Sequence, residues 1–218
     1  MDGYVRPSPS SPVVRDADGR VIDYGSRWEG SPPEDSYSVD SHPERFAPLR
    51  EVVEALVDHM RVTYDVEVVE GAEVAADLVR PVGEVVRATR VQPRDRSCAA
   101  LTFVLTSYPA VVLHAGLLYD VTVPGCGCDA CDSTWESEAD ELEQLVRAVV
   151  SGGFRETVDR RLHTWVGFSW ATADQGASGR TRADSIDARR VRAARRRLRT
   201  VRRGWAPWPT VDAERVPS

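Results

Sequence analysis

The 218-residue sequence contains neither lysine nor asparagine, and only two isoleucines, Ile22 and Ile186. These residue types use A/T-rich codons, so their scarcity indicates a high-G+C bacterial genome. All 28 Lys or Arg positions are arginine, which in such a genome also takes the surface role of lysine. A high density of arginine therefore cannot be taken at face value as a nucleic-acid signal in this chain.

Long hydrophobic runs are missing as well. No apolar stretch approaches the roughly 18 residues that a membrane-spanning helix needs. The first nine residues lack the apolar centre of a secretory signal. The sequence therefore predicts a cytoplasmic protein without a membrane partner. Its four cysteines are then expected as free thiols or metal ligands rather than as structural disulfides.

Composition divides the chain into four predicted parts. Residues 1–41 are rich in Pro, Ser, Gly and Asp and are expected to form a flexible arm, in which Asp16-Ala17-Asp18-Gly19 marks a hairpin turn. An α+β core is predicted over 42–182. A basic helix with a Trp-Pro anchor should follow over 183–209, and a tail over 210–218.

Hydrophobic periodicity predicts the helices of the core. Apolar residues recur at three- and four-residue steps over about 43–65 and again over about 133–150. Ser41 and Glu44 have the spacing of a capping box for the first helix. Pro48 conflicts with that start because it lacks a backbone donor, so the regular helix should begin near Pro48 or follow a short turn.

Alternating apolar residues predict the strands, at 84–91, 101–106, 111–115, 117–123, 154–158 and 162–170. Short turns join the middle strands, which favours an antiparallel meander. Residues 175–180 are predicted as a Gly/Ser loop. The expected fold class is α+β, with an antiparallel sheet of roughly four to six strands packed with two or three helices.

Three of the four cysteines, Cys126, Cys128 and Cys131, fall within six residues at the corner between a strand and an acidic helix. Thiolates are the soft ligands that zinc and iron–sulfur centres prefer, and Cys128-x-x-Cys131 has the spacing of one zinc knuckle. The sequence therefore predicts that the three sulfurs converge and hold a metal ion, with Zn²⁺ as the cofactor.

A second zinc knuckle is missing, so a fourth ligand must come from elsewhere. The predicted meander places Cys98 and His114 toward its opposite end, which makes both of them poor ligands. Asp129, Asp132, His163 or a water molecule remain as candidates.

Two other interpretations of the cysteines stay open. A CxxC motif at a strand-to-helix corner is typical of thiol oxidoreductases, where the helix N-terminus lowers a thiol pKa. Asp129 and Asp132 flank the thiols here and are expected to raise the pKa instead. Alternatively, the segment is a glycine-containing turn that uses small buried cysteines.

Residues 101–132 and the acidic helix after them resemble an uncharacterised family from actinobacteria-type genomes, classed as a domain of unknown function. The resemblance spans about residues 40–170, and Cys126-Gly127-Cys128-Asp129-Ala130-Cys131 is its specific part. Ser133 and Thr134 depart from a Glu-rich helix start. The resemblance implies a distinct domain and supplies no reaction, substrate or cofactor.

The C-terminal basic segment, residues 180–203, carries eleven arginines and two aspartates, a net charge of +9. Because the whole chain is −6, the remainder carries −15. Such a segment could bind nucleic acid, but no DNA-binding signature accompanies it. We expect instead that it docks on the core, with some arginines facing carboxylates of the acidic body, such as those of 136–143. An apolar stripe should carry the docking together with Trp205: Val191, Ala194, Leu198 and Val201.

These features favour a metal-stabilised binding or interaction module centred on the cysteine corner. The alternatives are a thiol-based redox enzyme that uses the same cysteines and a nucleic-acid-associated protein that uses the arginine helix. A protein partner is compatible with each of them. The sequence does not decide whether the chain is an enzyme, and it names no substrate.

Overall fold

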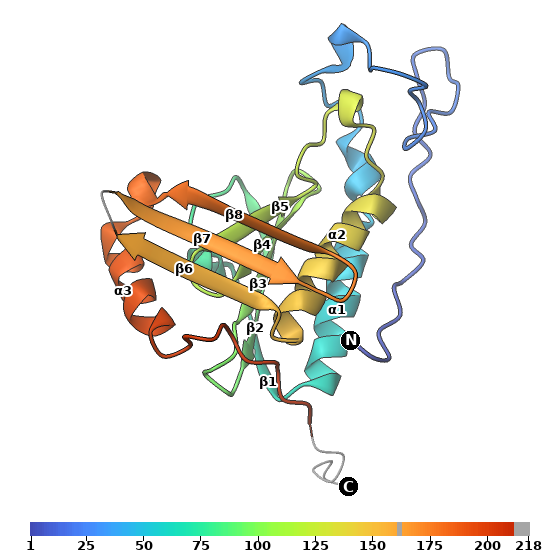
Figure 1. The fold of residues 1–218 in the computed structure, drawn as a ribbon. Coiled ribbons are helices and arrows are strands. Elements are labelled where there is room, and N and C mark those ends of the chain that lie inside the picture. Colours follow the sequence, from blue (N-terminus) through green and yellow to red (C-terminus); the bar gives the residue numbers. More distant parts are fainter. Residues whose placement is uncertain (161–162, 212–218) are drawn as a thin grey trace, which may run out of the picture.

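The computed structural model describes residues 1–160 and 163–211, and its fold is α+β. A five-stranded antiparallel sheet has the order β1-β2-β3-β4-β5, and a separate three-stranded antiparallel sheet has the order β6-β7-β8 (Figure 1). The strands of the larger sheet are β1 (Val66–Glu70), β2 (Val85–Pro93), β3 (Leu101–Thr106), β4 (Val111–Ala115) and β5 (Tyr119–Val123). Those of the smaller sheet are β6 (Phe154–Arg160), β7 (Thr164–Ala171) and β8 (Gly176–Arg182).

Within the described residues, three α-helices accompany the sheets: α1 (Leu49–Thr63), α2 (Trp135–Val150) and α3 (Ala188–Leu198). The short 3₁₀ helices are η1 (Glu34–Ser36), η2 (Pro43–Phe46), η3 (Ala72–Asp77), η4 (Asp129–Cys131) and η5 (Ala183–Ser185). Helices α1 and α2 cover one face of the larger sheet, and their apolar stripes form the main core with β3 and β4. None of the helices within the described residues is both long enough and apolar enough to cross a bilayer.

Pro48 divides the first predicted helix into two pieces. Residues 43–46 form the 3₁₀ helix η2, and Pro48 is the N-cap residue of α1, where a missing backbone donor costs little. The expected capping box does not form. The Ser41 hydroxyl donates instead to the Asp129 carboxylate, 2.6 Å away. Ser41 therefore connects the segment before η2 to the loop that carries the cysteines.

The meander forms as predicted, with Thr102 opposite His114 and Val111 opposite Val123. The smaller sheet lies beside the edge strand β5, where the ring centroids of Tyr119 and Phe168 are 4.1 Å apart. Strand β1 was not predicted. The loop predicted over 175–180 is wrong, because residues 176–182 form β8 and pair with β7 along its whole length.

The C-terminal segment docks as expected. Val191 and Ala194 of α3 are buried, and Leu198 and Val201 pack on the main core. The indole N–H of Trp205 donates to the buried Glu156 carboxylate at 3.1 Å. The indole of Trp208 donates to the Ala99 carbonyl at 2.9 Å, so both rings anchor the chain. Most of the tail predicted over 210–218 lies outside the described residues.

Part of the acidic surroundings expected for the basic segment is present, because hydrogen bonds from Ser97 and then the charge of Arg197 lower the pKa of Asp95. Two of the carboxylates of 136–143 have another partner. The carboxylates of Glu143 and Asp140 on α2 are held by Arg6, which reaches α2 from the N-terminal arm. The ion pair described within the basic segment joins Arg182 to Asp184 at 2.7 Å.

Candidate metal centre

The three cysteines lie between the end of β5 and the start of α2. Residues 129–131 form the 3₁₀ turn η4, and Asp132 ends it in the left-handed conformation at φ 53°. Aspartate tolerates this conformation better than most residues other than glycine. Thr134 then caps α2 through a reciprocal capping box with Ser137. Local turn chemistry thus forms a compact loop directly before the helix.

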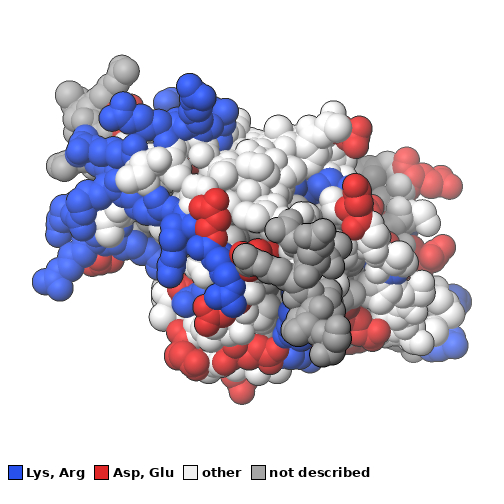
Figure 2. Space-filling view, turned by 90° about the horizontal axis from the view of Figure 1, so that it is seen from below, with Lys and Arg blue, Asp and Glu red and all other residues white. Residues whose placement is uncertain are grey.

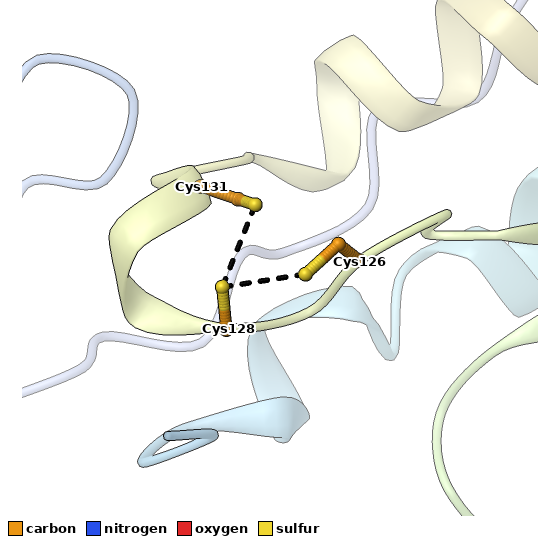
Figure 3. A group of neighbouring side chains, drawn as sticks. All are labelled: Cys126, Cys128 and Cys131. Atoms are coloured by element: carbon orange, nitrogen blue, oxygen red, sulfur yellow. Dashed lines mark hydrogen bonds between the residues drawn. The ribbon is translucent and has the colours of Figure 1, made fainter. Parts of the chain in front are cut away.

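The cysteine side chains point toward one another (Figure 3). The Sγ atom of Cys128 lies 3.3 Å from that of Cys126 and 3.5 Å from that of Cys131, and all three sulfurs lie within 4.8 Å of one another. Three thiolates on one tetrahedral zinc, with Zn–S bonds of about 2.3 Å, would be about 3.8 Å apart. All three are free thiols. The predicted convergence of the sulfurs is therefore confirmed.

Cys128 is the buried member of this cluster, at 8% exposure, while Cys126 and Cys131 are exposed. A hydrogen bond from Cys126 lowers the pKa of Cys128 to about 7, and contacts with the backbone of Cys131 and Ser38 add to this against the opposing effect of burial. The pKa of Cys131 is raised, chiefly by its hydrogen bonding to Cys126 and then Cys128. One thiolate therefore forms readily, and a nearby cation would favour the others.

The aspartates of the loop are engaged elsewhere. Asp132 accepts from Arg27 Nε at 2.6 Å, and Asp129 accepts from Ser41 at 2.6 Å and from Tyr24 at 3.2 Å. The expectation that these carboxylates raise the pKa of the whole thiol cluster is wrong for Cys128, whose pKa is lowered. Since Arg27 balances the charge of Asp132, the carboxylates act by positioning the loop.

The candidate fourth ligands do not join the sulfurs. Within the described residues, the group at metal-binding distance consists of the three cysteines. Asp129, Asp132 and His163 do not belong to it. Cys98 donates to the Pro207 carbonyl at 3.2 Å, and His114 pairs with Asp120 at 2.6 Å, so both are remote as predicted. Three protein ligands would leave one position of a tetrahedral ion open to water or to another molecule.

A shell of arginine and aromatic side chains surrounds the loop, and sequence reasoning missed it. Arg45, at 4% exposure, donates to the Gly127 carbonyl at 2.7 Å, and Arg27 donates to the Asp129 carbonyl. The Tyr24 ring lies against both guanidinium groups, 4.1 Å from that of Arg27 and 4.2 Å from that of Arg45. One sequence feature could have indicated this shell: the run Tyr24-Gly25-Ser26-Arg27-Trp28 places two aromatic residues and an arginine together in an otherwise Pro/Ser-rich arm.

Comparison with known proteins identifies one matching family. The model of a family of unknown function, DUF6226, matches residues 10–212. This range is longer than the expected resemblance over 40–170, and it includes the arm residues of the shell as well as α3. No curated protein matches the chain, and no solved structure matches it either.

Proposed function

The chain belongs to the family of unknown function DUF6226, and we propose that it is a zinc-stabilised binding or interaction module. Cys126, Cys128 and Cys131 are the proposed ligands. The observation that carries the proposal is the convergence of their three sulfurs within 4.8 Å of one another. This spacing is close to the separation of about 3.8 Å that three thiolates have on one tetrahedral zinc ion.

The exposure of the thiols also supports a metal. A turn that uses cysteine only as a small apolar residue would bury it, yet Cys126 and Cys131 are exposed. Three thiolates and one Zn²⁺ carry a net charge of −1, which nearby positive charge would stabilise. Arg27 and Arg45 flank the same loop and donate to its carbonyls, so they can supply that charge and orient the ligands.

The module would act through the surface that the metal loop organises. A bound ion would link the end of β5 to η4, and the Asp129 N–H already donates to the Val39 carbonyl of the arm at 2.7 Å. Zinc would therefore fix the arm, the loop and the start of α2 relative to one another. Its open position would accept water or a ligand from a protein partner.

Metal analysis of the full chain, purified without chelator, tests this proposal. We expect about one equivalent of zinc, removal of which frees three thiols and lowers the melting temperature. Serine variants of Cys126, Cys128 and Cys131 should each lose stoichiometric zinc. Cys98→Ser is the matched control and should retain it. A metal-free protein with fully reactive thiols and no response to added zinc would contradict the proposal.

The lowered pKa of Cys128, at about 7, favours one second candidate, a thiol–disulfide exchanger. The Cys128 thiolate would attack an external disulfide and release one substrate thiol. The Cys131 thiol, 3.5 Å away, would then lose its proton, close the Cys128–Cys131 disulfide and release the second substrate thiol. This candidate predicts a protein that accumulates that disulfide and does not respond to chelation.

A further inference from the structure

Arginine side chains gather at the end of the molecule that α3 occupies (Figure 2). One side of α3 docks on the protein through Val191 and Ala194. Arg190 belongs to that docking, because its guanidinium donates to the Leu78 carbonyl at 2.7 Å and to the Leu117 carbonyl at 3.0 Å. Arg197 also contacts the rest of the protein, through the Arg96 carbonyl. A different group of arginines lines a separate part of the surface.

Three arginines of α3 and its C-cap residue Arg199 line a groove of about 470 Å³ beside the helix. Arg192, Arg195, Arg196 and Arg199 follow the spacing of one helix face and span about 10 Å along the axis. Aliphatic residues also line the groove, among them Ala183, Ile186 and Val191. The acidic residue in the described lining, Asp184, is paired with Arg182 at 2.7 Å, which leaves the groove strongly positive.

We propose that this groove binds a small phosphorylated molecule with an aliphatic portion. Like charges three and four residues apart on a helix repel one another, and a bound anion would relieve that repulsion. The planar guanidinium matches the geometry of phosphate and can donate to it bidentately. The aliphatic part of the lining would hold the carbon skeleton.

The shape of the site favours a small molecule over a nucleic-acid strand. The groove is concave, and its volume lies in the range of ordinary ligand pockets. Sites for single strands combine basic grooves with aromatic rings on which the bases stack. The described lining of this groove contains no aromatic residue. This inference is independent of zinc, because none of the cysteines lines the groove.

Calorimetric titration of the full chain with three probes tests the proposal: hexyl phosphate, inorganic phosphate and hexanol. Hexyl phosphate should bind at least about tenfold more tightly than inorganic phosphate, because its methylene groups move out of water and are buried in the groove. Hexanol should not bind measurably, because it offers the arginines no anion. Equal affinity for the two phosphates would overturn the proposal, and so would a lack of binding by hexyl phosphate.

A matched pair of variants locates the site. Arg195→Ala removes a groove arginine, whereas Arg189→Ala removes an exposed arginine of the same helix that does not line the groove. Both changes keep the helix propensity high and alter the net charge equally. We expect Arg195→Ala to weaken hexyl phosphate binding by about 10-fold to 100-fold, as for loss of a charge-assisted hydrogen bond. Arg189→Ala should change it less than about twofold.

A nucleic-acid arm would give a different result. Single-stranded and duplex oligonucleotides would then bind more tightly than hexyl phosphate, with an affinity that falls steeply with salt. Arg189→Ala and Arg195→Ala would weaken that binding equally, which would overturn the groove as the site. Repeating the titration with Cys128→Ser should leave hexyl phosphate binding unchanged, so failure of this inference and failure of the zinc proposal are separable.

Discussion

The Arg45 side chain contacts three backbone carbonyls around the cysteine loop. Its nitrogens lie 2.7 Å from the Gly127 oxygen, 2.8 Å from the His42 oxygen and 3.3 Å from the Ser133 oxygen. A lysine would keep the charge but cannot reproduce this planar set of donors. We expect Arg45→Lys to cost about 1–3 kcal/mol of unfolding free energy, because partly buried carbonyls lose their donors. Zinc affinity should fall by about 10-fold to 100-fold.

Urea unfolding and a competitive zinc titration would measure these two effects. Arg61→Lys provides the control, because Arg61 lies on the exposed side of α1 with 48% of its side chain accessible. That change should stay within about 0.5 kcal/mol. If both variants unfold and bind zinc alike, then Arg45 does not position the loop.

Glu138 presents a second residue-scale effect, which depends on pH. It lies in the first turn of α2 at 7% exposure, and none of the described residues offers its buried Oε2 atom a hydrogen bond. Burial raises the pKa of this carboxyl. Because its folded-state pKa exceeds the unfolded value of about 4.3, the carboxyl favours the folded state below that value. This stabilisation is lost as the pH rises through the folded-state pKa.

The direction of this pH dependence gives a prediction for Glu138→Gln, which removes the titrating group. The stability of the parent relative to the variant should decrease from acidic to neutral pH, as measured by urea unfolding at a series of pH values. Glu136→Gln, an exposed change in the same helical turn, should show no such trend. Parallel pH profiles for the parent and Glu138→Gln would contradict the assignment.

At the scale of elements, strand β8 was predicted as a Gly/Ser loop because of its glycines. Six of its seven residues are exposed, so the strand carries almost no alternating apolar signal. Gly179 packs under the Phe168 ring, and a Cβ atom there would lie 2.8 Å from a ring carbon. Phe168 is itself held against Tyr119, at 4.1 Å between ring centroids. The glycine therefore marks a close approach within a sheet, and local sequence cannot distinguish that from a loop.

Alanine substitution tests this explanation of β8. Gly179→Ala should cost about 1–3 kcal/mol of unfolding free energy, because the ring cannot move away freely. Gly83→Ala is the matched control, since a Cβ atom there meets nothing within 4 Å. It should be neutral or stabilise by up to about 1 kcal/mol through the unfolded chain. Thermal unfolding of both variants gives the comparison, and equal melting temperatures would refute the packing explanation.

The other elements show which signals the sequence does carry. The meander was predictable because its strands alternate or are largely apolar and its turns are short, as around Pro109. The break at Pro48 was predictable from the missing donor. Strand β1 was not, because Val66–Glu70 follows α1 directly and is only partly buried. The cysteine convergence followed from local spacing, whereas Tyr24 and Arg27 reach the loop across about 100 residues, which local patterns cannot show.

The whole molecule is organised around β3 and β4, whose residues are all buried. The helices α1 and α2 cover one face, and a smaller apolar cluster that includes Val74 and Leu78 covers part of the other. The cysteine loop lies outside this core, at the corner where the arm meets the start of α2. Metal binding should therefore control the order of that corner much more than the stability of the central strands.

Hydrogen exchange of the full chain, with and without a zinc chelator, measures this separation. Chelation should speed exchange in residues 24–45 and 124–134, because the metal no longer restrains the cysteine loop. The loop in turn holds the arm through the hydrogen bond from the Asp129 N–H to the Val39 carbonyl. Amides of β3 and β4 should stay protected, because their opening requires disruption of the main core. Equal acceleration in β3 and β4 would make the metal part of global folding. No change at residues 124–134 would show that the cysteines hold no structural ion.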